Sequence, residues 1–240
     1  MHISSLKNFF PKNFILCLST IKNLYLVRFA VKSYSQEGED IILNRIFNKN
    51  KGFFVDVGAH HPFRFSNTYF FYKKGWRGIN IDAAPGSMKL FNKFRKRDIN
   101  LELAINSKRQ KMDFFIFEEG ALNSFSQELS EKRMAAGFPL KYKTEIVTST
   151  LEEVLNAHNS EFETIDFLSI DVEGSDLDVL RSNDFKKYRP KVIIVEVLNK
   201  GFKEVLESGI NRFLEEQHYV LRAKSINSVF YTDSLVKNFL

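Results

Sequence analysis

The chain has 240 residues, of which 44% are hydrophobic and 27% charged, a balance that favours one folded α/β domain over a disordered chain. The net charge of +6 is a mild excess, and the one dense basic cluster, residues 89–97, is interpreted as a solvated helix face, so no nucleic-acid partner is expected. The single cysteine, Cys17, excludes an internal disulfide and a cysteine-based zinc cluster, and it favours cytoplasmic residence.

Residues 1–32 are apolar and basic and form an extension before the domain. Lys22, Asn23 and Arg28 interrupt the apolar run, which therefore falls short of the ~18 residues that a spanning helix needs. We favour a helix that packs on the domain or on a second copy of the chain, as in a homo-oligomer. The alternative is an interfacial anchor that places the protein at a membrane surface, with basic side chains facing lipid headgroups.

An amphipathic helix is expected after residues 34–40, where acidic residues precede apolar positions up to Phe47. The segment Phe53–Pro62 follows, and the rest of the chain is organised around it. Its β-branched and aromatic run ends on Asp56 and turns at Gly58, as a buried parallel strand does. Because Gly58 has no Cβ, we expect backbone N–H groups of this turn to approach a ligand.

A second apolar run, Gly78–Asp82, ends on an acid about 25 residues after Asp56, which is the spacing of a βαβ nucleotide-binding unit. The carboxylate of Asp82 can accept hydrogen bonds from both hydroxyls of a ribose. The pattern therefore predicts a cofactor that contains adenosine, and it leaves open which one.

The remaining chain alternates between predicted strands and helices. The expected strands are 99–105, 112–117, 145–150, 165–170, 192–197, 219–222 and 228–231, and the expected helices are 66–74, 88–94, 151–157, 176–180 and 202–217. An insertion at residues 118–143 shows little periodicity, and we interpret it as a substrate lid. The alternation predicts an α/β fold, with a mostly parallel sheet, an antiparallel edge hairpin and helices on both faces.

Four segments resemble the FkbM family of S-adenosylmethionine-dependent methyltransferases. They are Tyr34–Asp40, Phe53–His60, Gly75–Asp82 and Phe167–Gly174. The resemblance implies a Rossmann-like class I methyltransferase sheet in a domain of residues 33–240. It also implies methyl transfer to an oxygen atom, often that of a sugar or a glycan precursor.

The resemblance further implies a set of cofactor-binding residues. It places Asp56 and Gly58 beside the methionine part of S-adenosylmethionine, and Asp82 on the ribose hydroxyls. Pro62 stands where many members have glycine, and because proline has no N–H, it cannot donate to a cofactor there. The expected set is completed by Ala83, Ala104 and Gln36, and for Gln36 a role in capping the following helix is an equal alternative.

Asp171 lies in the segment that reaches the methyl-transfer site in this family. A neutral sugar hydroxyl is a poor nucleophile, so a base or a metal ion must help to remove its proton. The candidate catalytic residues are Asp171, Glu173, His60 and His61. The candidate ligands for Mg²⁺ or Mn²⁺, which prefer carboxylate oxygens, are Asp171, Glu173 and Glu196.

Each of these candidates has a structural alternative. Asp171 can cap the helix that follows, Glu173 can be a hydrogen-bonding turn residue, and Glu196 can belong to a buried ion pair. One of His60 and His61 can simply fill the loop. The apolar strand before Asp171 favours a functional role for this residue, because an acid buried without a partner is unfavourable.

The sequence thus predicts an S-adenosylmethionine-dependent O-methyltransferase that acts on a sugar, either a nucleotide-linked sugar or a surface-glycan unit. A nicotinamide-dependent sugar oxidoreductase is the alternative enzyme, although the Gly-x-Gly-x-x-Gly pattern of that class is absent. A third alternative is a membrane-associated binding protein without catalytic activity.

Overall fold

The computed structural model describes residues 11–23, 31–47, 49–198 and 200–236. The chain forms two units, Met1–Lys32 and Ser33–Leu240. The first unit contains helix α1 (Lys12–Ile21), and the rest of the predicted extension, residues 1–10 and 24–30, lies outside the described residues. Among the described residues, no helix is long and apolar enough to cross a membrane.

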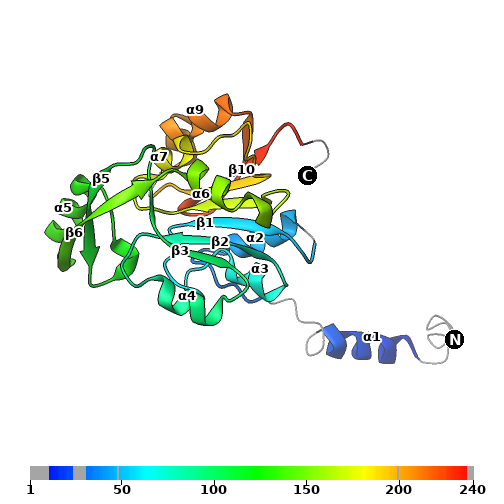
Figure 1. Cartoon of the computed structure of the whole chain (residues 1–240). Coiled ribbons are helices and arrows are strands. Elements are labelled where there is room, and N and C mark those ends of the chain that lie inside the picture. Colours follow the sequence, from blue (N-terminus) through cyan, green and yellow to red (C-terminus); the bar gives the residue numbers. More distant parts are fainter. Residues whose placement is uncertain (1–10, 24–30, 48, 199, 237–240) are drawn as a thin grey trace. The chain divides into compact units, whose positions relative to one another are not determined.

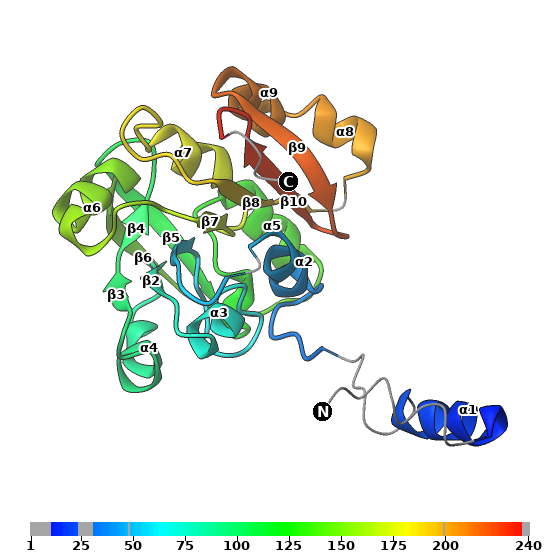
Figure 2. The same ribbon diagram turned by 90° about the vertical axis from the view of Figure 1, so that its right-hand side faces the viewer.

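The second unit is built on a seven-stranded sheet with the order β3-β2-β1-β7-β8-β10-β9, whose strands are labelled in Figures 1 and 2. Its strands are β1 (Phe53–Val57), β2 (Arg77–Asp82), β3 (Ile99–Glu102), β7 (Phe167–Ile170), β8 (Val192–Glu196), β9 (Tyr219–Lys224) and β10 (Ser228–Asp233). Neighbouring strands from β3 to β8 are parallel, whereas β10 runs antiparallel to both β8 and β9. This arrangement confirms the predicted mostly parallel sheet with an antiparallel edge.

Helices cover both faces of this sheet (Figure 2). Its central strands β1 and β7 are therefore buried along their whole length. One face packs against α6 (Leu151–Ala157), α7 (Asp176–Arg181) and α9 (Gly209–Glu216) through a core that includes Val55, Ile170 and Leu214. The other face packs against α2 (Glu39–Ile46) and α3 (Tyr69–Lys73) around Phe54 and Phe167. Helix α4 (Met88–Phe94) lies beside β3.

A second, three-stranded sheet has the order β4-β6-β5. It consists of β4 (Ala104–Ile105), β5 (Lys111–Phe117) and β6 (Leu140–Ser149), and the segment between β5 and β6 carries a 3₁₀ helix (Gly120–Leu122) and helix α5 (Gln127–Ala135). The prediction of one strand over 99–105 is therefore wrong, because β3 and β4 belong to different sheets. The insertion at 118–143 is also more regular than expected, since it contains α5 and the start of β6 (Figure 1).

The helix predicted over 202–217 is interrupted. It consists of α8 (Phe202–Leu206) and α9, and the break falls where the Ser208 side chain accepts a hydrogen bond from Asn211 N and so caps the second helix. The predicted start of α6 is confirmed, since Thr150 and Glu153 form a capping box there.

Candidate active site

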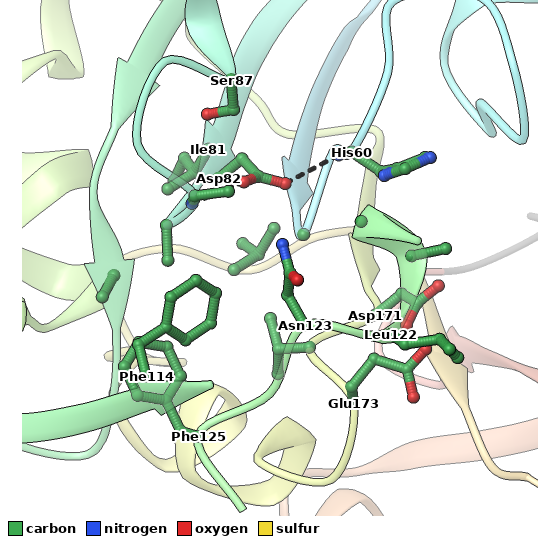
Figure 3. Close-up of a pocket in the computed structure, with 18 of the residues that line it drawn as sticks. His60, Ile81, Asp82, Ser87, Phe114, Leu122, Asn123, Phe125, Asp171 and Glu173 are labelled. Atoms are coloured by element: carbon green, nitrogen blue, oxygen red, sulfur yellow. Dashed lines mark hydrogen bonds between the residues drawn. The ribbon is translucent and has the colours of Figure 1, made fainter. Parts of the chain in front are cut away.

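A cavity of about 540 Å³ lies where β1, β2, β7 and β8 end. Parallel strands direct their carboxyl ends to one edge of a sheet, so the loops that follow them meet there. Figure 3 shows Asp82 at one end of this cavity and Asp171 with Glu173 at the other. The predicted site residues that line it are Gln36, Gly58, His60, Asp82, Ala83, Ala104, Asp171, Glu173 and Glu196.

Asp82 is held by the backbone of two neighbouring loops. Its carboxylate accepts hydrogen bonds from His60 N at 2.9 Å and from Ala84 N at 2.8 Å. Burial raises the pKa of Asp82 above its usual range, although the two backbone N–H groups oppose that shift. The carboxylate is therefore fixed in place with acceptor capacity left for a ligand hydroxyl.

Gly58 lines the cavity, but its backbone N–H is not available to a ligand as predicted. Its N–H and that of Ala59 both donate to Ile81 O, at 2.9 and 3.0 Å, so neither is free for a ligand. With φ at +85°, the chain turns in the left-handed region, and a Cβ at this position would lie 1.7 Å from Asp171 O. Glycine is thus required because β1 and β7 approach each other closely at this edge.

Two predicted residues do not line the cavity. The side chain of Asp56 lies on the opposite face of β1 from Val55 and accepts a hydrogen bond from Thr68 Oγ1 at 3.0 Å, so the expected contact with the cofactor's methionine part is not supported. Burial raises the pKa of Asp56 to about 6. Nδ1 of His61 accepts two backbone N–H groups of its own loop, each at 3.1 Å, which is the structural role considered for one histidine.

His60 does line the cavity and adopts a φ of +52°. Its ring stacks on Phe65, with ring centroids 6.5 Å apart. Burial lowers the pKa of His60 below its usual range, so the imidazole is neutral at neutral pH and can accept a proton.

The acids at the other end form a cluster. Carboxylate oxygens of Asp171, Glu173 and Glu196 all lie within 4.8 Å of one another. Burial and the neighbouring charge of Glu196 raise the pKa of Asp171 well above its usual range, and burial raises that of Glu196 to about 8. Asp171 Oδ1 is buried and has no hydrogen-bond partner among the described residues. The cluster therefore holds at least one proton at neutral pH.

Glu173 connects this cluster to the insertion. Arg133 of α5 forms an ion pair with the Glu173 carboxylate and donates to Leu122 O at 2.7 Å, while Ser124 Oγ donates to Glu173 O at 2.7 Å. Glu173 itself adopts a φ of +53°, a strained conformation for a side chain of this kind. Sequence reasoning missed Arg133, because nothing distinguishes it from the adjacent Lys132.

The insertion and the second sheet also supply aromatic side chains. Phe114 of β5 and Phe125 have ring centroids 4.4 Å apart, and both line the cavity on the side away from Asp171 (Figure 3). Neither was predicted as a site residue. Phe114 lies in a predicted strand and Phe125 in the insertion, and the sequence carries no signal that these two segments meet.

The basic cluster at residues 89–97 is only partly the solvated face that was predicted. Arg95 is fully buried, with Nε 2.8 Å from Asp98 Oδ2 and Nη1 donating to Pro62 O at 3.1 Å. Its guanidinium carbon lies 4.6 Å from the centroid of the Tyr72 ring. The other basic side chains of this segment are exposed, so Arg95 alone is part of the core.

Several solved methyltransferases are similar to this chain in structure. One is methyltransferase FkbM from Methylobacillus flagellatus KT, at 11% identity and a TM-score of 0.49; the match covers 76% of this chain and 44% of that one. Another is a precorrin-6y C5,15-methyltransferase from Geobacter metallireducens GS-15, at 13% identity and a TM-score of 0.43, covering 85% and 89% of the two chains. An O-methyltransferase from Bacillus cereus in complex with SAH has 12% identity and a TM-score of 0.37, covering 92% and 91%.

The chain matches no curated protein. The family model of the methyltransferase FkbM domain matches residues 56–221, a range that includes β2, β3, β7 and β8 of the main sheet and the whole of the second sheet. The strand order and the antiparallel edge are those of the class I methyltransferase sheet that the resemblance implies. The chain belongs to the FkbM family of methyltransferases.

Proposed function

We propose that this protein is an S-adenosylmethionine-dependent O-methyltransferase that acts on a sugar hydroxyl. The observation that carries this proposal is one cavity with a backbone-anchored carboxylate, Asp82, at one end and a cluster of three acids at the other. The first suits the ribose of an adenosyl cofactor, and the second suits a hydroxyl that must lose a proton.

The residues present fit the cofactor. A volume of about 540 Å³ is within the usual range for sites that enclose a ligand of this size. Asp82 can accept the ribose hydroxyls, and the apolar wall with Phe114 and Phe125 can pack against an aromatic base. When bound, S-adenosylmethionine would supply a sulfonium methyl group that an oxygen nucleophile can accept, with S-adenosylhomocysteine as the leaving group.

The acid cluster provides the proton acceptor for such a reaction. Asp171 lines the cavity beside Glu173 and Glu196, where a hydroxyl of the acceptor can meet its carboxyl group. Asp171 can orient that hydroxyl and, in its ionised form, take up the proton as the oxygen attacks. His60, neutral at neutral pH, is the second candidate base on the same cavity.

The same three carboxylates are our candidates for binding Mg²⁺ or Mn²⁺, because hard oxygen ligands suit these ions. A bound divalent cation would lower the pKa of a coordinated hydroxyl. Treatment with EDTA should then abolish turnover, and added Mg²⁺ or Mn²⁺ should restore it. Full activity after EDTA treatment would show that no metal ion is needed. The base would then be Asp171, Glu173 or His60.

A sugar is the proposed acceptor because the resemblance points to sugars and because clustered acids favour a ligand rich in hydroxyl groups. Membership of a methyltransferase family argues against the nicotinamide-dependent oxidoreductase. It also argues against a binding protein without catalytic activity.

Calorimetry with S-adenosylhomocysteine tests the cofactor part of the proposal. We expect one molecule to bind per chain, and Asp82→Ala to weaken binding at least ~10-fold through loss of a charge-assisted contact. Asp113→Ala removes an exposed acid on β5 and should leave binding unchanged. Absence of binding to the unaltered protein would refute the assignment. The acceptor is then sought by screening sugars, glycan fragments and sugar nucleotides for a mass gain of one methyl group.

A further inference from the structure

A second cavity adjoins the first and opens next to the acid cluster. It has a volume of about 340 Å³ and shares two lining residues, Glu196 and Leu198, with the larger cavity. We call it the side groove. Because Glu196 belongs to both, a ligand in the side groove reaches the acid cluster without passing Asp82, which does not line the groove.

The walls of the side groove are mainly apolar. Leu129 comes from α5, Leu177 from α7 and Ile210 from α9, so three helices far apart in the sequence build it. Asp176 also lines it, but its carboxylate accepts hydrogen bonds from two backbone N–H groups of the preceding loop, at 3.1 and 3.2 Å. This acid is therefore already satisfied within the fold.

The groove offers little to an anionic ligand. Lys200 is the only cationic side chain among its described lining residues, and the acids Asp176 and Glu196 lie in the same walls. A diphosphate placed there would have a single cationic partner and would lie beside the carboxyl groups of Asp176 and Glu196. An alkyl or other uncharged apolar group meets leucine and isoleucine side chains instead.

We propose that the side groove binds an apolar substituent of the acceptor, while the hydroxyl to be methylated lies at the acid cluster. The inference rests on the proposed function and narrows its substrate class. The acceptor is a glycoside whose sugar carries an uncharged apolar group, in contrast to a nucleotide-linked sugar.

Binding of two glycosides to the full chain, saturated with S-adenosylhomocysteine, tests the inference. The probes are n-octyl β-D-glucopyranoside, used below its micelle concentration, and methyl β-D-glucopyranoside. We expect the octyl compound to bind at least ~10-fold more tightly, because several methylene groups leave water. Leu129→Trp and Gly209→Phe, which fill the groove from α5 and α9, should each abolish that gain.

Glu131→Trp is the matched control, since it adds the same bulk to an exposed position of α5 and should keep the gain. Melting temperatures show whether each variant is folded. Equal affinity for the two glycosides, or a gain that survives both groove variants, would overturn the inference. So would tighter binding of uridine diphosphate glucose than of the octyl compound. Binding of S-adenosylhomocysteine alone is titrated separately, so a failure of the proposed function is distinguished from a failure of the groove.

Discussion

Asp171 combines burial, an unpartnered oxygen and two neighbouring acids, and a purely structural acid would not need this combination. We predict that Asp171→Asn lowers turnover by at least ~100-fold, because an amide cannot take up the hydroxyl proton. Affinity for S-adenosylhomocysteine should change little, since Asp82 lies at the other end of the cavity. Turnover is measured with the acceptor found in the mass screen.

The control for this variant is Asp178→Asn, on the helix that follows the acid cluster. Asp178 does not line the cavity and should tolerate the same change. Turnover that persists in Asp171→Asn would assign the base role to Glu173 or His60. A parallel loss of cofactor binding would instead show that Asp171 has a structural role.

The raised pKa of Asp56 leads to a prediction about how the stability of the fold depends on pH. Burial raises its pKa in the folded state to about 6, above that of an exposed aspartate. The folded state therefore binds this proton more tightly than the unfolded state does. The resulting contribution to the free energy of unfolding, roughly 3 kcal/mol at most, is complete below about pH 4 and is lost as the pH rises through about 6. Asp56→Asn removes the ionisation and keeps an oxygen that can accept the Thr68 hydroxyl.

The difference in melting temperature between Asp56→Asn and the unaltered protein should therefore grow in favour of the variant between pH 4 and pH 7.5. An increase of about 5 °C or more is expected for a unit of this size. Thermal unfolding monitored by circular dichroism at several pH values measures it. A difference that stays constant over this range would mean that the pKa of Asp56 is not raised.

The position of Asp56 also shows where residue-level prediction failed. The predictions for Asp82 and Asp171 placed them on the cavity because they end or follow their strands. Asp56 lies inside β1, where side chains alternate between the two faces of the sheet. Since Val55 and Val57 face one core, Asp56 must face the other, and the alternation in the sequence already contained that information.

At the scale of elements, α5 is held against the site by the ion pair between Arg133 and Glu173, whose side chains are 9% and 15% exposed. We predict that Arg133→Ala loosens α5, because it leaves Glu173 without its counter-charge. A loss of about 1–3 kcal/mol is expected for a pair buried to this extent. Hydrogen exchange of residues 127–135 should become faster, and the acceptor should bind less well.

Lys132→Ala is the control on the same helix. Lys132 pairs with Glu128, but both side chains are largely exposed, at 70% and 79%, so this pair contributes little. Protection of α5 should be unchanged in this variant. Equal exchange in Arg133→Ala and in the unaltered protein would show that other contacts hold the helix in place.

The elements of the second sheet were the least predictable part of the fold. Strands β1, β2, β7 and β8 have apolar runs, so the local sequence is enough to predict them. Helix α5 has no apolar stripe, because its buried positions are Ser130 and Arg133. The first residues of β6 are mostly exposed, and their pairing with β5 spans the whole insertion, so no local pattern marks them.

At the scale of the whole molecule, the two units differ in net charge. Residues 1–32 carry five basic and no acidic side chains, so they hold five of the six net positive charges and leave +1 for residues 33–240. The apolar residues of α1 lie in the basic unit. Anionic lipid attracts such a segment by about 1 kcal/mol for each basic residue near the surface. On this ground we propose that residues 1–32 act as the interfacial anchor, the alternative to packing.

We therefore predict that the full chain co-sediments with vesicles that contain phosphatidylglycerol, and that a chain beginning at Ser33 stays in the supernatant. Higher salt should weaken the binding, because the attraction is electrostatic in part. Vesicles of phosphatidylcholine alone are the control and should bind much less. If both chains remained in the supernatant and only the full chain formed a dimer on gel filtration, residues 1–32 would contact a second copy instead. Binding of the shortened chain to the vesicles would place the membrane contact on the methyltransferase domain.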